Sequence, residues 1–187
     1  MKRIFDFSIS LILSMLLIPI IVLVVIAVKV TSKGPIIFKQ KRVGRYNEEF
    51  EIYKFRTMKT NTPNVATKDL GQNSSDYLTT IGSFLRKASL DEIPQLFNVI
   101  KGDMSLVGPR PIIGKEKKLI ELRKEKDIHS ILPGITGLAQ INGRDDLSVE
   151  QKVFLDEVYM HDKSKIKDIK ILYRTIFKVA KREGIVY

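Results

Sequence analysis

The chain has 187 residues, enough for one globular domain plus an appendage, and it contains no cysteine, which excludes disulfides, thiolate metal sites and a cysteine nucleophile. Its formal net charge is +11, concentrated in residues 29–59 and 163–187, so we expect an anionic partner. Nucleic acid, anionic lipid and anionic small substrates all agree with that charge.

The most apolar segment runs from Phe7 to Val28 and contains 22 residues without a charge. As a helix it would be about 33 Å long, which is enough to cross a bilayer core. Basic residues flank both ends, and the positive-inside rule therefore favours the cytoplasm for both. Pro19 near the middle favours a kink. A re-entrant pair of half-helices meeting at Ile18-Pro19 and a kinked spanning helix are both compatible with these features.

Two β-like segments follow, at residues 36–38 and 50–58. In the second, aromatic residues alternate with Lys54 and Arg56. Such a pattern is found in strands that bind phosphates or nucleobases, and also in ordinary half-buried strands. Residues 81–88 then predict a short amphipathic helix with Arg86 on its polar side.

The central stretch, SLDEIPQLFNVIKGDMSLVGPRP, covers residues 89–111. Ser89 is a candidate helix N-cap, and Glu92 lies where a capping box would place it. Pro94 conflicts with a helix that begins at Ser89, so we expect a later start or a kink. The spacing predicts a helix with an apolar face, which we expect to be buried, formed by Ile93, Leu96, Phe97 and Ile100. Its opposite, polar face would carry Asp91, Gln95 and Asn98.

The acidic pair has two interpretations. Acidic residues in a first helical turn complement the helix dipole, and capping explains Glu92 without any chemistry. Alternatively, the pair is a reactive site, because the loop that follows offers Arg110 for bidentate phosphate binding. With no histidine or cysteine cluster, an oxygen-liganded cation such as Mg²⁺ would be the natural metal there.

The C-terminal part contains glycine-rich loops within residues 132–144 and a second capping box formed by Ser148 and Gln151. The last predicted helix, residues 164–182, has an apolar stripe flanked by lysines. This pattern is typical of an interfacial membrane helix, and also of a core helix with a solvated basic face. The N-terminal segment favours the membrane surface.

Together these residues resemble the small monotopic phosphoglycosyl transferases of the bacterial sugar transferase family. The likeness covers nearly the whole chain, and its motifs are KRIFD at residues 2–6, YKFRTM at 53–58, the central stretch, and PGITGLAQINGR at 133–144. Two positions depart from the usual pattern: Ile18 replaces the serine that often precedes the helix-breaking proline, and Leu138 replaces an aromatic residue.

The resemblance implies transfer of a sugar-1-phosphate from a UDP-sugar to polyprenyl phosphate, with release of UMP, at the cytoplasmic face of the bacterial cell membrane. It implies that Asp91 is the nucleophile and a Mg²⁺ ligand, and that Glu92 is its catalytic partner. The substrate-binding candidates are Arg110, Pro111, Arg86, Lys54, Arg144 and Asp168.

The expected fold is α+β and mostly helical, with a re-entrant membrane helix at residues 1–30 and a membrane-associated catalytic domain at 31–187. Expected partners are the two substrates and membrane lipid, without nucleic acid; a homo-oligomer is left open. A membrane-tethered scaffold that binds nucleic acid or anionic lipid is the main alternative, although no nucleic-acid motif is present. A conventional nucleotide-sugar glycosyltransferase lacks an evident nucleotide-binding α/β repeat.

Overall fold

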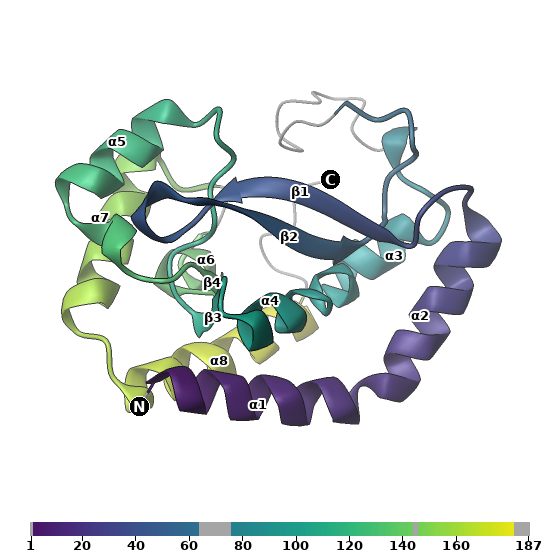
Figure 1. The fold of residues 1–187 in the computed structure, drawn as a ribbon, viewed down its shortest axis with the longest axis horizontal. Helices are drawn as coiled ribbons and strands as arrows, with labels where there is room; N and C mark the ends of the chain where they lie inside the picture. The colour runs from purple at the N-terminus through teal and green to yellow at the C-terminus, as the bar shows by residue number, and fades with distance from the viewer. Residues whose placement is uncertain (1, 64–75, 144–145, 182–187) are drawn as a thin grey trace.

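The computed structural model describes residues 2–63, 76–143 and 146–181, and these form the expected α+β, mostly helical fold. Two apolar helices, α1 (Lys2–Leu16) and α2 (Ile18–Thr31), run along one side of the other elements (Figure 1). The division of the chain at residue 30 stays a prediction.

The predicted break at Ile18-Pro19 is confirmed. Helices α1 and α2 are bent by 63° with respect to one another. Pro19 lies in the first turn of α2, where its missing N–H costs no helical hydrogen bond. Among the described residues, no single helix is long and apolar enough to cross a membrane, whereas the bent pair together has the required length and composition.

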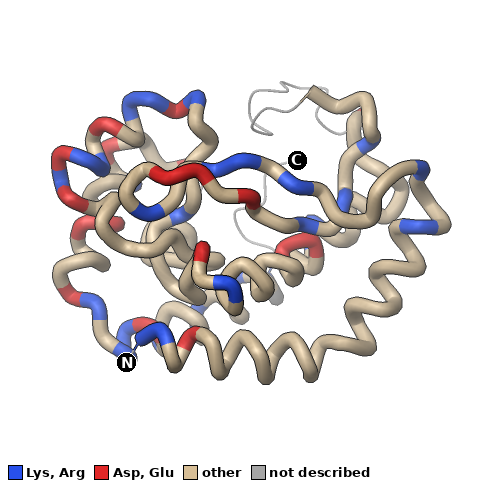
Figure 2. The backbone as a smooth tube through the Cα atoms, in the orientation of Figure 1, with Lys and Arg blue, Asp and Glu red and all other residues tan. Residues whose placement is uncertain are grey.

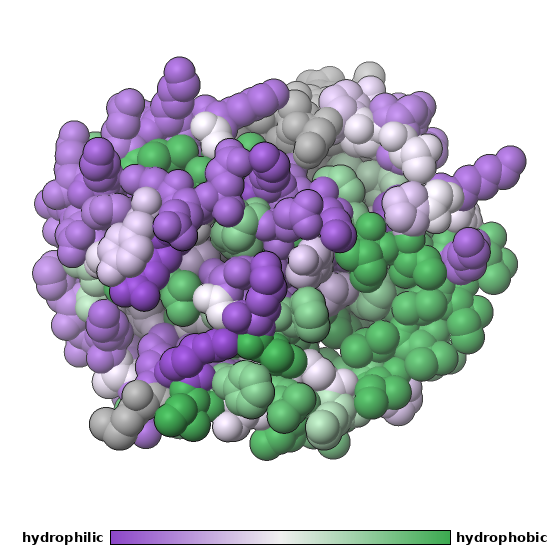
Figure 3. All heavy atoms as spheres, in the orientation of Figure 1, coloured by the Kyte–Doolittle hydropathy of each residue, from purple (hydrophilic) through white to green (hydrophobic). Residues whose placement is uncertain are grey.

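Much of the surface of this helix pair is exposed and apolar, as the green area of Figure 3 shows. Leu16 and Leu23 are 69% and 67% exposed, whereas Val24 and Val28 are buried against the rest of the chain. A continuous apolar surface of this kind is expected of a membrane-contacting segment.

The remaining elements form a small body with two short sheets. Strands β1 (Ile37–Val43) and β2 (Glu49–Phe55) are antiparallel, with Gln40 opposite Ile52, and a 3-10 turn at Arg45–Asn47 joins them. Strands β3 (Ser105–Val107) and β4 (Gly134–Thr136) are parallel. The helices are α3 (Gly82–Lys87), α4 (Gln95–Lys101), α5 (Lys117–Glu125), α6 (Leu138–Ile141), α7 (Val149–His161) and α8 (Lys165–Lys181).

The main core lies between β2, α4, β3, α7 and α8. Its fully buried side chains include Val99, Met104, Val107 and Tyr159. Helix α7 begins with the predicted capping box. The backbone N–H of Gln151 donates to the Ser148 hydroxyl, and the backbone N–H of Ser148 donates to Gln151 Oε1.

Helix α8 turns its apolar stripe outward. Ile166, Tyr173 and Ile176 are each more than 60% exposed, whereas Asp168 and Ile171 are buried against the body. The helix is therefore not a core helix with only its basic face exposed, and its outward apolar stripe is typical of an interfacial helix.

Candidate active site

Asp91 and Glu92 lie in a 3-10 turn, Leu90–Glu92, that precedes α4. The predicted capping box at Ser89 is wrong: Ser89 is left-handed (φ 52°, ψ 20°) and its side chain makes no capping hydrogen bond. Helix α4 begins only at Gln95, with Pro94 as its N-cap residue. Because proline has no N–H to join a helical ladder, the chain makes a separate tight turn first, and that turn carries the acidic pair.

The acidic turn packs beside β2 and α3. Leu90 and Ile93, on either side of the acidic pair, pack against a buried cluster that contains Val24 and Val28 of α2. Phe55 of β2 and Leu85 of α3 complete that cluster. The acidic turn therefore shares a core cluster with α2.

The predicted buried face of α4 is partly wrong. Phe97 is 58% exposed, whereas Gln95 and Asn98 are buried. The reason is the edge of β2: the Tyr53 amide donates to Asn98 Oδ1 at 3.0 Å, and Asn98 Nδ2 donates to the Glu51 carbonyl at 2.7 Å. Asn98 Nδ2 also donates to Asp103 Oδ2 at 3.3 Å. Because these three bonds satisfy the buried amide group, the polar face faces inward and Phe97 faces outward.

Two predicted substrate-binding cations meet Glu92. Lys54 Nζ donates to Glu92 Oε1 at 2.8 Å, and Arg110 Nη2 lies 3.7 Å from the same oxygen. The carboxylate of Glu92 is mostly buried, with 13% of its side chain exposed. Asp91, the neighbouring residue, is 6% exposed. The site thus combines two carboxylates with cations from β2 and from the loop after β3.

Arg42 of β1 is a third cation at this site, which sequence reasoning missed. Its guanidinium donates to Gln40 Oε1 at 2.6 and 3.0 Å and to the Pro111 carbonyl at 3.3 Å. Burial, and next the nearby Arg110, lower the pKa of Arg42 to about 10, while the acidic residues Glu116 and Glu92 partly offset this. The sequence signal that could have found Arg42 is the alternation of side chains along β1. It places Arg42 on one face of the strand and Lys39 and Lys41 on the other.

The loop that carries Arg110 is held by a buried ion pair. Arg123 of α5 donates to Asp156 Oδ2 of α7 at 2.6 and 3.1 Å, and also to the Arg110 carbonyl at 2.8 Å. Gly108 allows this loop to approach the next one, since a Cβ there would lie 2.5 Å from the Leu132 carbonyl oxygen. Pro111 is buried, and its carbonyl is the one that Arg42 contacts.

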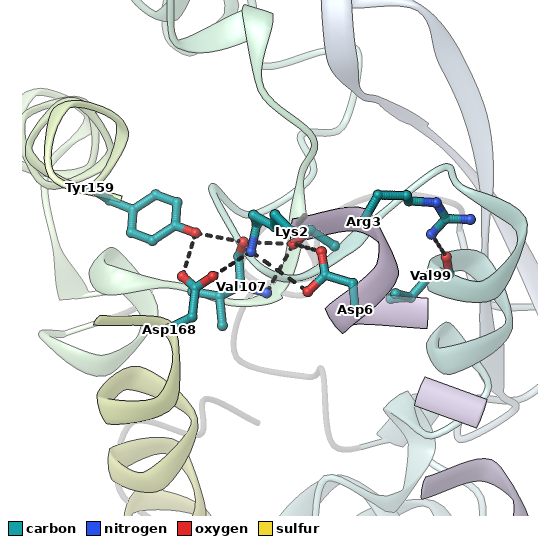
Figure 4. A network of polar contacts seen from close by, with 8 residues as sticks. Lys2, Arg3, Asp6, Val99, Val107, Tyr159 and Asp168 are labelled. Atoms are coloured by element: carbon teal, nitrogen blue, oxygen red, sulfur yellow. Dashed lines mark hydrogen bonds and ion pairs between the residues drawn. The ribbon is translucent and has the colours of Figure 1, made fainter. Parts of the chain in front are cut away.

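The other predicted site residues lie in different surroundings. Arg86 of α3 donates to Thr57 Oγ1 at 2.9 Å, and α3 packs beside the acidic turn. Asp168 instead accepts bonds from Lys2 at 2.6 Å and from Tyr159 at 2.7 Å, at the start of α1 (Figure 4). Within the described chain, none of its bonds reaches the acidic turn. Arg144 lies outside the described residues.

Metal ligands are few around this site. Among the described residues, no group of three histidine, aspartate or glutamate side chains could hold a metal ion. Asp91 and Glu92 are adjacent carboxylates, which fits Mg²⁺, because this ion commonly takes one or two protein carboxylates and completes its shell with water and substrate phosphates.

Comparison with known proteins gives consistent results. The family model described as "Bacterial sugar transferase" matches residues 1–182. An undecaprenyl-phosphate glucose phosphotransferase of Komagataeibacter xylinus is 41% identical over 94% of this chain, and an undecaprenyl-phosphate galactose phosphotransferase of Salmonella typhimurium is 38% identical over 98%. The chain spans only 35% and 41% of these two relatives. An uncharacterized sugar transferase of Bacillus subtilis, EpsL, is 42% identical over 99% of this chain and 90% of its own length.

Proposed function

Because this chain belongs to the bacterial sugar transferase family, we propose that it transfers a sugar-1-phosphate from a UDP-sugar to polyprenyl phosphate and releases UMP. The observation that carries the proposal is the placement of the acidic turn. Leu90 and Ile93 pack against the buried cluster to which α2 contributes Val24 and Val28, so the acidic turn and the apolar helix pair share one core cluster. A lipid-borne phosphate and a soluble nucleotide-sugar would both have access there.

The proposed reaction has two displacements at one phosphorus atom. A carboxylate oxygen of Asp91 attacks the sugar-bearing phosphorus of the UDP-sugar, the bond from that phosphorus to the bridging oxygen breaks, and UMP leaves. A phosphate oxygen of the polyprenyl phosphate then attacks the same phosphorus and expels the Asp91 carboxylate. The products are the lipid diphosphate sugar and a regenerated aspartate.

The cations around Glu92 suit the diphosphate of the donor. Arg110 presents a planar fork for phosphate oxygens, and Lys54 and Arg42 add positive charge from the two strands of the hairpin. Glu92 holds Lys54 and Arg110 together and is the proposed partner of Asp91. For Arg86, Pro111 and Arg144 a substrate contact stays a proposal, whereas the bonds of Asp168 support a structural role.

Mg²⁺ is the proposed cofactor, with Asp91 as its protein ligand. Asp91 and a diphosphate are both anionic and repel each other, so their approach requires a counter-charge. The bound cation would neutralise charge on the diphosphate, while Arg110, Lys54 and Arg42 orient it. The proposal is supported by the chemistry of the two adjacent carboxylates.

The contacts at the two ends of the helix pair support a re-entrant arrangement. At the start of α1, Lys2 binds Asp168, and Arg3 donates to the carbonyls of Val99 and Ile100. At the end of α2, Arg56 donates to the Ser32 carbonyl at 3.0 Å. Because both ends bind the same body, we propose that the pair enters and leaves the membrane on one side, the cytoplasmic face of the bacterial cell membrane.

A panel of UDP-sugars tests this function and identifies the sugar. The full chain in lipid, with Mg²⁺ and polyprenyl phosphate, should release UMP from one UDP-sugar far faster than from the others. Release that requires no polyprenyl phosphate over many turnovers would contradict the transfer. Strong, salt-dependent nucleic-acid binding without UMP release would favour the scaffold alternative.

A further inference from the structure

An open cavity of about 600 Å³ lies at the end of α2, separate from the cations around Glu92. It is bordered by the end of α2, the segment after β2 and the start of α3. Its lining is rich in hydroxyl groups and contains two lysines; among its residues are Thr31, Ser32, Lys33, Lys59, Thr60 and Ser83.

A buried arginine lies directly behind this lining. Arg56 is 4% exposed, and its Nη2 atom donates to the hydroxyl of Ser32 at 2.8 Å. Its Nη1 atom lies beside Gly34, where an added Cβ would be 2.3 Å from it. Arg56 therefore contacts one residue of the cavity wall, Ser32, through both the hydroxyl and the carbonyl.

This guanidinium is incompletely compensated. Its Nε and Nη1 atoms are buried and have no hydrogen-bond partner among the residues that the structure describes. Across residues 2–63, 76–143 and 146–181, no carboxylate forms an ion pair with Arg56, Lys33 or Lys59; the side-chain Nζ of Lys59 donates to the carbonyl of Asp76, at 2.6 Å. A buried charge with unpaired donors is costly, and an anion in the adjacent cavity would lower that cost.

We propose that this cavity binds the phosphate of a lipid headgroup. Two lysines and several hydroxyl donors line it and Arg56 lies behind Ser32, which suits a phosphate, and its position at the end of α2 suits a lipid. Val30, on the last turn of α2, is 79% exposed, and Lys29 and Lys33 flank that end, where Figure 2 shows lysines in blue. Cations at the end of a membrane-inserted apolar helix lie at the depth of lipid phosphates.

Two lipid sources share this chemistry: the phosphomonoester of polyprenyl phosphate and the phosphodiester of an anionic phospholipid. The inference rests on the membrane placement in the proposed function but not on the transfer reaction. UMP release and lipid binding are separate readouts, so failure of one proposal is distinguishable from failure of the other.

Because the chain has no cysteine, one introduced at exposed Asn61 can carry a fluorescent dye beside the cavity. The full chain in neutral detergent micelles is titrated with phosphatidylglycerol, with polyprenyl phosphate and with inorganic phosphate. We expect saturable binding of a lipid phosphate and, for Lys33→Ala/Lys59→Ala, a half-saturating concentration at least about tenfold higher. Arg56→Lys, which keeps the positive charge but loses the planar guanidinium with its several donors, should also weaken binding of the lipid phosphate.

The matched control is Lys115→Ala/Lys124→Ala, which removes the same charge from exposed positions at and before α5, on the other side of the body (Figure 1). Its binding should equal that of the unsubstituted chain. Saturation by polyprenyl phosphate alone would identify the reaction's acceptor, and saturation by both lipids a general headgroup site. An equal shift in the control, tighter saturation by inorganic phosphate, or no saturation by either lipid would overturn the proposal.

Discussion

Lys2 Nζ lies 2.6 Å from Asp168 Oδ2, joining the start of α1 to α8 near the two ends of the described chain. Asp168 also accepts a bond from the hydroxyl of Tyr159, which itself donates to the Val107 carbonyl at 3.0 Å. Figure 4 shows how this network holds α1 against α7, α8 and β3. The first residues of the membrane-type helix are thus bound to the body rather than left in solvent.

Breaking this pair should destabilise the fold. In Lys2→Met the buried carboxylate of Asp168 loses its cation, and we expect a loss of about 2 kcal/mol, reduced from the fully buried case because Lys2 is 36% exposed. Denaturant unfolding in detergent measures it. Lys118→Met, which removes an exposed ion pair with Glu150, is the control and should leave the unfolding free energy nearly unchanged. Equal losses in both variants would refute the anchoring role.

Re-entrancy predicts that both ends of the helix pair are accessible from one side. Cysteines placed ahead of Met1 and at Lys41 should react with an impermeant reagent on the same side of a sealed vesicle. Met15→Cys, near the bend and 59% exposed, should be protected by lipid. Labelling of the two ends from opposite sides would establish a spanning helix instead.

The Arg123–Asp156 pair should act on both stability and donor binding. In Asp156→Asn the buried guanidinium loses its counter-charge, at a cost of about 3 kcal/mol, and its bond to the Arg110 carbonyl is weakened. We therefore expect a lower unfolding free energy and a higher KM for the UDP-sugar. An unchanged KM in a measurably destabilised variant would show that this pair does not position Arg110.

Arg42 should favour substrate binding at the expense of stability. Its pKa in the fold, about 10, lies well below its ordinary value, so folding disfavours the charged form. That penalty is fully present below about pH 10 and disappears as the pH rises from there towards the ordinary pKa of the side chain. At pH 7, Arg42→Gln should therefore keep or raise the unfolding free energy while the KM for the UDP-sugar rises about tenfold.

The control for Arg42 is Lys41→Gln, on the opposite face of the same strand, where its partner is the exposed Glu49. It should leave KM unchanged. A lower unfolding free energy with unchanged KM for Arg42→Gln would mean that the residue only supports the hairpin.

Local signals in the sequence predicted several elements correctly. Pro19 marked the bend between α1 and α2, and Ser148 with Gln151 marked the start of α7, because proline geometry and capping act over a few residues. Ser89 failed because Pro94 imposed a separate turn that the capping pattern does not encode.

Long-range contacts could not be predicted. The inward position of Asn98 depends on backbone groups of β2 that are 45 and 47 positions away. Arg42 likewise belongs to the site because its strand passes the Pro111 carbonyl, 69 positions away. Neither partner is visible from spacing within one helix or strand.

The role of Asp91 is tested most directly by Asp91→Asn, which keeps the size of the side chain and removes the nucleophilic charge. With the preferred UDP-sugar, Mg²⁺ and polyprenyl phosphate, this variant should release no UMP, whereas Asp162→Asn, at an exposed ion pair, should retain full activity. Without polyprenyl phosphate, the unsubstituted chain should gain the mass of one sugar phosphate and the variant should not. Full UMP release by Asp91→Asn would contradict the proposed mechanism.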